Sequence, residues 1–215
     1  MPIAVSIAVM DPKPAPQRPT HQKPTIRPAT RAEIPALLAL IRELADYEKL
    51  SHLVVNDEAH LERELFGEGS RAEAIVCRAG GEIVGMAIYF HNFSTFLGRK
   101  GLYLEDLYVQ PAHRGRGYGK ALLLALARIA HERGCGRFEW MVLDWNEPSI
   151  RFYASLGAVR MEEWRLVRVA GEALEKPPRI PARPPGKGAR RPATTRVPPW
   201  WRSGERRRRA GDLGA

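Results

Sequence analysis

The stretch "RGRGYGKALLLALARIA", residues 114–130, decides how the rest of the chain is interpreted. Three glycines alternate with basic and aromatic residues, and the chain then becomes rich in Leu and Ala, which favour helix where glycine disfavours it. A glycine-rich turn that opens a helix exposes unpaired backbone N–H groups and a positive dipole end at close range. We therefore expect a negatively charged group to bind against this backbone.

Two common phosphate-binding motifs do not fit the turn. A P-loop requires G-x-x-x-x-G-K-[S/T], but here Arg114 stands where the first glycine should be and Ala121 where Ser or Thr should be. A dinucleotide fingerprint requires G-x-G-x-x-G, and the last position is Lys120 or Leu122, depending on the starting glycine. The motif that remains is R-x-x-G-x-G, formed by Arg114, Gly117 and Gly119.

The charge and the prolines separate the chain into a middle and two tails. Residues 177–215 carry 11 Lys and Arg against 2 acids, residues 1–24 carry 3 against 1, and residues 25–176 carry 20 against 21. Of the 18 prolines, all but four lie in the two tails. Such composition favours disorder, so we expect a disordered head over 1–24, one folded domain over 25–176 and a disordered Pro- and Arg-rich tail over 177–215. The net charge of +10 thus belongs to the tails, which argues against a basic fold that grips nucleic acid.

Other compositional signals are compatible with the cytoplasm, which is the location we expect. Cys77 and Cys135 give neither a disulfide framework nor metal-ligand spacing, and Cys135 is typical of inert packing. No apolar run reaches the ~20 residues that a membrane-spanning helix needs. The apolar run at the start has no basic residues ahead of it, so we expect no secretory signal. The six histidines have no partners at metal spacing, and we expect no metal.

Residues 25–176 alternate strands and helices. Thr30 and Glu33 form a capping box before a helix of apolar residues at helical spacing, and a second helix is expected from Asn56 or Asp57 to Phe66. Gly80-Gly81 predicts a hairpin. The expected strands are 26–30, two within 73–93, 101–109, 137–143 and 163–169, and the remaining helices run to about 133 and over 147–157. This order predicts a mixed α/β sheet with helices on its faces.

The R-x-x-G-x-G turn resembles the coenzyme A pyrophosphate loop of the GNAT acetyltransferase superfamily. Six pieces in order resemble the spermidine/spermine and thialysine N-acetyltransferase family: "IRPAT", "IRELADYE", "LYLEDLYV", "RGRGYGKALL", "DWNEPSIRFYASLGA" and "EWRL". The resemblance implies a mostly antiparallel sheet, flanked by helices and splayed between its fourth and fifth strands. It also implies acetyl-CoA as co-substrate, a small amine as acceptor and a homodimer.

The resemblance also assigns residues. Tyr153 matches the proton donor and Glu105 a carboxylate that acts as base. The residues that match the cofactor site are Leu107, Tyr108, Val109, Arg114, Gly115, Arg116, Gly117, Tyr118, Gly119, Lys120, Asn146, Glu147, Pro148 and Ser149. The residues that match the amine site are Tyr47, Glu48, Glu105, Asp106 and Trp164.

The residue types suit acyl transfer to an amine. A substrate ammonium has a pKa near ~10 and attacks only after losing its proton, so a carboxylate must attract the cation and help to deprotonate it. Glu105 and Asp106 are adjacent, and a regular strand would point them to opposite faces. A backbone N–H near Val109 would stabilise the oxyanion, and Tyr153 would supply a proton to the leaving thiolate. An aromatic on a short helix is equally typical of core packing, so Tyr153 keeps two interpretations.

The sequence departs from the polyamine-specific pattern before the catalytic strand. Those relatives carry an acid and a tryptophan where "HNFSTFLGRKG" has Ser94 and Phe96. The expected acceptor is therefore a primary amine of a diamine, polyamine or thialysine-like amino acid. Two alternatives stay open: an acyltransferase for another amine, such as an amino-acid side chain or an antibiotic, and a nucleic-acid or membrane-surface binder acting through "RRRR" at 206–209 beside Trp200-Trp201. That basic tail could equally have no role.

Overall fold

A computed structural model describes residues 23–176 of the protein. The chain divides into two units, residues 1–168 and 169–215, and the short helix α5 (Glu172–Glu175) belongs to the second. The regular elements of the first unit, in chain order, are β1 (Thr25–Pro28), α1 (Ile34–Tyr47), α2 (Glu58–Phe66), β2 (Ala72–Ala79), β3 (Glu82–Ser94), β4 (Arg99–Val109), α3 (Tyr118–Glu132), β5 (Phe138–Glu139) and α4 (Glu147–Ser155).

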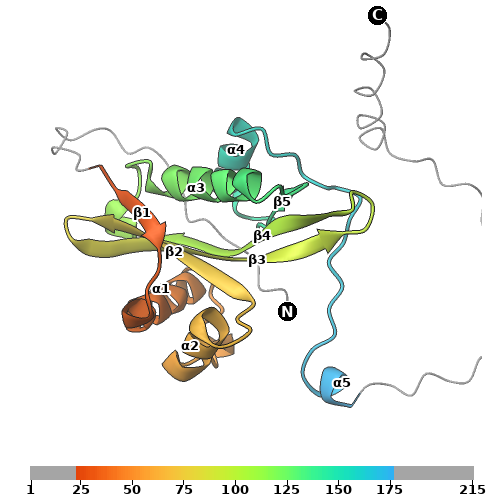
Figure 1. Ribbon diagram of the computed structural model, residues 1–215, viewed down its shortest axis with the longest axis horizontal. Coiled ribbons are helices and arrows are strands. Elements are labelled where there is room, and N and C mark those ends of the chain that lie inside the picture. The colour runs from red at the N-terminus through yellow and green to blue at the C-terminus, as the bar shows by residue number, and fades with distance from the viewer. Residues whose placement is uncertain (1–22, 177–215) are drawn as a thin grey trace, which may run out of the picture. The chain divides into compact units, whose positions relative to one another are not determined.

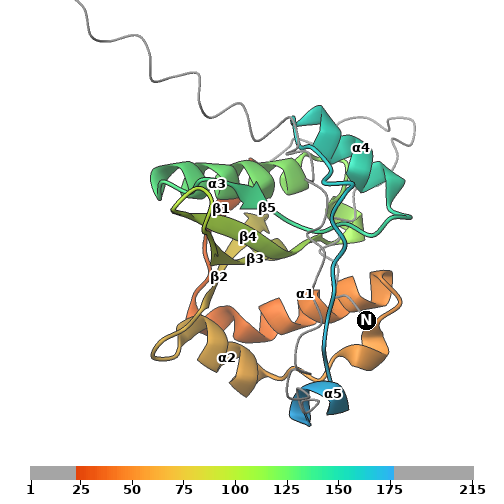
Figure 2. The same cartoon turned by 90° about the vertical axis from the view of Figure 1, so that its right-hand side faces the viewer.

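The five strands form one sheet in the order β1-β2-β3-β4-β5. The first three pairings are antiparallel, and β4 and β5 are parallel. A parallel pair needs a crossover connection, which α3 provides. Helices α1 and α2 cover one face of the sheet, and α3 and α4 lie on the other (Figures 1 and 2). The predicted fold class, a mixed and mostly antiparallel sheet flanked by helices, is confirmed.

Local sequence signals start the first elements as expected. The backbone N–H of Thr30 donates to Glu33 Oε2 at 2.9 Å, which completes the predicted capping box. Asp57 caps α2 by accepting from the backbone N–H of His60 at 2.7 Å. Gly80 and Gly81 both have positive φ and form the two-residue turn between β2 and β3.

Two apolar clusters fill the space between the sheet and its helices. The cluster on the α3 side includes Leu104 and Leu107 of β4 together with Tyr153 of α4. The cluster on the α1 side includes Tyr108 of β4 and Met86 of β3. The side of the sheet on which a β4 residue lies therefore decides which helices it contacts.

Strand β4 carries a register shift at Glu105. Ile88 pairs with Asp106, but the next residue of β3, Tyr89, pairs with Leu104, so Glu105 is an extra residue. Such a bulge breaks the alternation of side chains. Because Leu104 and Leu107 both lie in the α3-side cluster, the two acids between them share the α1 side. The expectation that Glu105 and Asp106 point to opposite faces is wrong for this reason.

The sheet opens beside β4. The pairing of β5 with β4 consists of Leu102 with Phe138 and Tyr103 with Glu139, so the rest of β4 from Leu104 onward has no such neighbour in the described chain. The predicted strand over 137–143 is therefore shortened to two residues, and the predicted splay between the fourth and fifth strands is confirmed.

The last predicted strand, 163–169, is wrong. Residues 159–170 form no strand and are exposed throughout. Their alternating pattern favours a strand, but β propensity needs a neighbouring strand and a face to pack on. Neither is present for this segment within residues 23–176. The predicted domain limits of 25–176 stay a prediction, and the predicted disordered tails lie outside the described residues except for residues 23–24.

Candidate active site

The glycine turn has the geometry of an open cradle. After β4 ends at Val109, Gly115 and Gly117 adopt positive φ of 75° and 79°. A Cβ at either position would meet no atom within 4 Å, so the space above this backbone is free. Gly117 is the N-cap residue of α3 and offers no side-chain cap, which leaves the first N–H groups of the helix for another acceptor. Arg116 and Lys120 are exposed beside it.

Arg114 turns away from that cradle. Its Nε donates to the backbone oxygen of Val109 at 2.9 Å. Its guanidinium lies over the rings of Tyr47, at 5.2 Å, and Tyr108, at 5.4 Å. Arg114 therefore connects the turn to the end of α1 and to β4, and Arg116 and Lys120 are the cations of the turn that stay exposed.

Glu48 is placed by the way in which α1 ends. The backbone N–H of Leu50 donates to the oxygen of Ala45 at 2.8 Å, and Lys49 has a φ of +61°, so the helix closes with a left-handed residue. Glu48 is only 8% exposed. Its Oε1 is buried and has no hydrogen-bond partner among residues 23–176. A buried carboxylate oxygen of this kind calls for a donor.

Three carboxylates, those of Glu48, Glu105 and Asp106, interact electrostatically near the end of α1. Burial, and then repulsion from Asp106, raise the pKa of Glu48 to about 7. Burial, and then repulsion from Glu105, raise the pKa of Asp106 to about 7, although Asp106 keeps part of its surface accessible. Burial also raises the pKa of Glu105, and the positive charge of Arg168 opposes that rise. The cluster is acidic and short of positive charge, which suits a cation.

Trp145 is an aromatic residue that contacts the end of α1. It lies in the connection between β5 and α4, and its ring centroid is 5.9 Å from that of Tyr47. The contact therefore joins the segment between β5 and α4 to the end of α1. The sequence interpretation gave Trp145 no role, although it stands directly before Asn146 in the quoted piece "DWNEPSIRFYASLGA".

Tyr153 and the start of α4 are deeply buried. Tyr153 is 4% exposed, and its ring lies 5.0 Å from that of Trp140. Asn146 caps α4 by accepting from the backbone N–H of Ser149 at 3.3 Å, and both side chains are fully buried. Glu147 is exposed at the same helix start. Tyr153 thus lies in the α3-side cluster together with Leu107 and Val109, the β4 residues expected to contact the cofactor arm.

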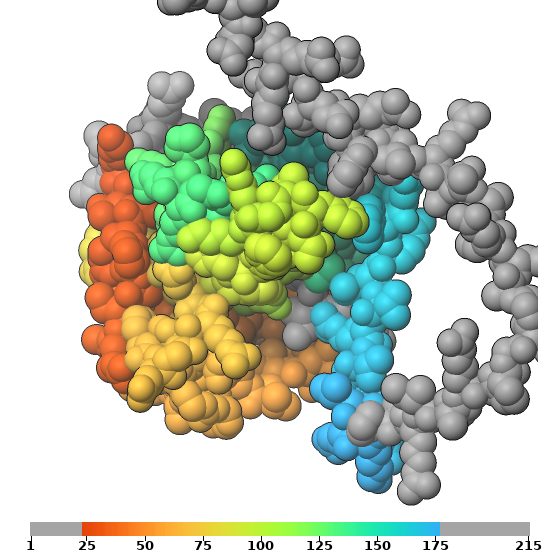
Figure 3. Space-filling model, turned by 45° about the vertical axis from the view of Figure 1, so that its right-hand side comes forward, coloured from red at the N-terminus to blue at the C-terminus, as the bar shows by residue number. Residues whose placement is uncertain are grey.

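Two further positions discussed from the sequence are Trp164 and Ser94. Trp164 is 64% exposed in the segment that forms no strand. Ser94 is buried, and its hydroxyl oxygen accepts from the backbone N–H of Leu97 in the β3–β4 turn. In Figure 3 the tip of this hairpin, in yellow-green, stands above α1 and α2 with a hollow between them.

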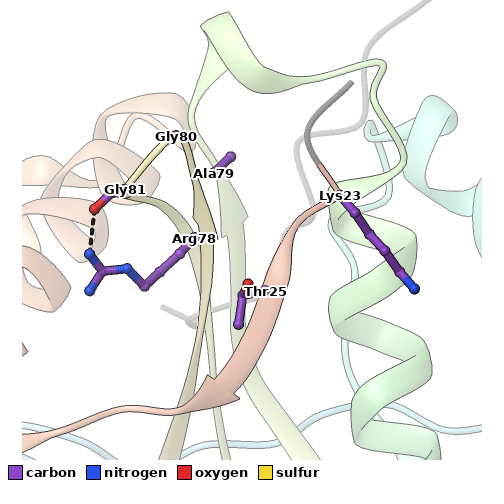
Figure 4. Close-up of a pocket in the computed structure, with 6 residues that line it drawn as sticks. All are labelled: Lys23, Thr25, Arg78, Ala79, Gly80 and Gly81. Atoms are coloured by element: carbon purple, nitrogen blue, oxygen red, sulfur yellow. Dashed lines mark hydrogen bonds between the residues drawn. The ribbon is translucent and has the colours of Figure 1, made fainter. Parts of the chain in front are cut away.

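A separate pocket of about 400 Å³ lies at the other end of the first strands. Figure 4 shows Arg78 turned toward Gly81, whose backbone oxygen accepts a hydrogen bond from it, while Lys23 points away. The pocket is lined by Lys23, Thr25, Arg78, Ala79, Gly80 and Gly81. None of these belongs to the site predicted from the sequence.

Two further searches cover residues 23–176. That part of the chain contains no group of three or more His, Cys, Asp or Glu side chains arranged to hold a metal ion. It also contains no helix with the length and apolar character needed to cross a membrane.

A sheet that opens beside its fourth strand, with a glycine cradle at the next helix, defines an α/β transferase of the N-acetyltransferase class. The model of the acetyltransferase (GNAT) family matches residues 38–158, more than half of the chain. The chain therefore belongs to the GNAT family and is an acyltransferase.

Two comparisons refine this assignment. The chain is 38% identical to a thialysine N-epsilon-acetyltransferase of Sus scrofa, over 70% of this chain and 95% of that protein. It is 34% identical to the human spermidine/spermine N(1)-acetyltransferase-like protein 1, over 69% of this chain and 23% of that protein. The predicted resemblance to these acetyltransferases is confirmed.

Among solved structures, the integron cassette protein VCH_CASS6 of V. cholerae superposes with a TM-score of 0.62 at 26% identity. The match covers 72% of this chain and 97% of that one. It supports the same fold.

Proposed function

We propose that the protein transfers the acetyl group of acetyl-CoA directly to a primary amine of a small substrate while both are bound. The observation that carries this proposal is the cluster of Glu48, Glu105 and Asp106, in which the buried Oε1 of Glu48 has no hydrogen-bond partner among residues 23–176, beside the part of β4 that lacks a β5 neighbour. An ammonium is the ligand that such a cluster favours, and a positively charged acceptor is what an N-acetyltransferase must bind and deprotonate.

The residues present fit acetyl-CoA. The free space over Gly115 and Gly117 and the uncapped start of α3 suit a pyrophosphate, with Arg116 and Lys120 adding charge. The part of β4 that lacks a neighbour on its β5 side includes Leu107 and Val109. Its free backbone groups suit the amide groups of the pantetheine arm. Acetyl-CoA supplies the acetyl thioester.

The residues of the site have separate roles in the proposed reaction. Glu48, Glu105 and Asp106 attract the ammonium, and the family resemblance assigns the base to Glu105. A backbone N–H near Val109 stabilises the oxyanion that develops when the amine attacks. Tyr153 lies on the α3 side of the sheet, and its hydroxyl supplies the proton that the departing sulfur takes up.

The acceptor is a diamine, a polyamine or a thialysine-like amino acid. One of the relatives is named a thialysine N-epsilon-acetyltransferase, and the other is named for spermidine and spermine. Ser94 carries no charge and is used within its own turn, so it does not grip a second ammonium. This favours substrates that need one firmly held ammonium.

The homodimer and the cytoplasmic location implied by the sequence stay predictions. The basic stretch at 206–209 and the Trp200-Trp201 pair lie outside the described residues, so a nucleic-acid or membrane-surface role for them also stays untested.

The deciding experiment is a coenzyme A release assay with acetyl-CoA and a panel of thialysine, ornithine, lysine, 1,4-diaminobutane and spermidine. We expect saturable turnover with at least one of them without added metal. Absence of amine-dependent release across the panel would contradict the proposed function. A spermidine preference of a hundredfold or more would contradict the substrate class.

A further inference from the structure

Glu48 and Asp106 are two carboxylates that lack a cation of their own. Neither forms a salt bridge with any Lys, Arg or His of the described chain. Glu48 is more than nine-tenths buried, and its Oε1 has no partner there. Buried charges in proteins are normally paired, because an unpaired one costs several kcal/mol. The pair is therefore completed by a positive group that is not part of residues 23–176.

Glu105 differs from this pair in its surroundings. It is the extra residue of the β4 bulge, and the charge of Arg168 acts on it. Burial raises the pKa of Glu105, and that positive charge opposes the rise by favouring the ionised form, whereas no cation opposes the rise at Glu48 or Asp106. Glu48 and Asp106 repel each other, so a proton shared between them relieves the repulsion.

We propose that Glu48 and Asp106 together accept the proton that the substrate ammonium gives up, and that Glu105 serves as an electrostatic anchor rather than as the base that the family resemblance assigns to it. The assignment rests on the proposed function. One N–H bond of the ammonium breaks, its electron pair stays on nitrogen, and the proton moves to a carboxylate oxygen of the pair. The neutral amine then forms the N–C bond with the acetyl carbon as the C–S bond breaks.

The surroundings of the pair support this role. Glu48 is only 8% exposed, which limits water at the carboxylate, and its chain neighbour Tyr47 packs against Trp145. A pKa near 7 for both acids means that the pair can take up a proton at neutral pH and release it afterwards. The titratable and charged groups on the elements around the pair are Glu43 and Tyr47 on α1, Tyr103, Glu105 and Tyr108 on β4, Arg114 in the glycine turn and Arg168 after α4.

A titration of the free protein tests the pair without any substrate. The full chain is labelled with ¹³C at its side-chain carboxyls, and the carbon shifts are followed from pH 4 to pH 9. We expect two wild-type carboxyls to titrate close to pH 7. In Glu48→Gln one of them disappears and the other moves to lower pH, because its repelling neighbour is gone. Ordinary acidic titration of every carboxyl in the wild type would overturn the proposal.

Kinetics with thialysine and saturating acetyl-CoA then separate the pair from Glu105. We expect kcat to fall by about 10²–10⁴-fold in Glu48→Gln, the usual contribution of a general base, and the acid limb of the pH profile to shift. We expect Glu105→Gln to raise KM and to lower kcat less than tenfold. The exposed Glu64 of α2 provides the control, and Glu64→Gln should leave both parameters unchanged.

The outcomes distinguish the two levels of the argument. A large loss of kcat in Glu105→Gln, with or without a loss in Glu48→Gln, would overturn the assignment of the pair as the proton acceptor. A wild-type protein that acetylates none of the five amines would overturn the proposed function itself, whatever the titration shows. Near-normal kcat in Glu48→Gln would overturn the inference and leave the proposed function standing.

Discussion

Replacing Glu48 by Gln should make the protein more stable at alkaline pH while it impairs catalysis. The side chain is buried, and its pKa rises from 4.5 to about 7 because burial and Asp106 disfavour its charge. Above pH 7 the folded protein carries this charge against that penalty, whereas the unfolded chain carries it in water. Gln has nearly the same shape and no charge, so the substitution removes the penalty.

The size of the effect follows from the shift. Each pKa unit corresponds to 1.36 kcal/mol, so a rise of this size makes the ionised form cost about 3 kcal/mol of folding free energy. Between pH 4.5 and pH 7 the folded state binds more protons than the unfolded state, so the wild-type free energy of unfolding falls as the pH rises. Below pH 4.5 both states are protonated, and the variant gains nothing.

Thermal unfolding at two pH values measures this difference. For a domain of this size, about 3 kcal/mol corresponds to a rise in Tm of about 6–12 °C at pH 8. At pH 5 the ionised form already costs about 0.8 kcal/mol, so the two proteins should differ by only about 2–3 °C. Glu64→Gln, on an exposed face of α2, is the control for the loss of one charge. An equal shift at both pH values, or a lower Tm of Glu48→Gln at pH 8, would refute the argument from burial.

Three further variants and one shortened chain test other parts of the site. Gly117→Val should weaken acetyl-CoA binding at least tenfold by calorimetry, whereas Gly134→Val, with a similar positive φ at the other end of α3, should not; equal binding by both variants would contradict the phosphate cradle. Tyr153→Phe keeps the ring and should lower kcat by about 10²–10⁴-fold with acetyl-CoA affinity unchanged, and near-normal turnover would assign Tyr153 to packing alone. Lys49→Gly should raise the free energy of unfolding by about 1 kcal/mol in urea titrations, because it removes a left-handed side chain, and no gain would contradict the strain. A protein of residues 24–176 should fold and retain acetyltransferase activity, and an inactive one would place part of the tails in the domain.

Much of the fold could be predicted because its signals are local. The Thr30–Glu33 capping box, the Gly80-Gly81 turn and the glycines before α3 each act within a few residues, and each has the predicted structure. The segment at 163–169 failed because a strand depends on a neighbour that no local pattern describes. The same holds for β5, which separates from β4 after two residue pairs. Pairing partners, not propensities, decide these elements.

The candidate site shows a second limit of sequence reasoning, because its chemistry depends on one irregular residue. With a regular β4, Glu105 and Asp106 would lie on opposite faces, and Asp106 would be separated from either Glu48 or Glu105 by the sheet. The extra residue in β4 instead turns both acids to the α1 side, where α1 ends at Glu48. Burial, and then repulsion among these carboxylates, raise the pKa values of Glu48 and Asp106 toward neutrality. A bulge has no composition signal in "YLEDLYV", so the sequence shows the three acids but not their proximity. Proximity is what makes them suited to bind a cation and take its proton, and the register shift in β4 is therefore the structural cause of the proposed chemistry.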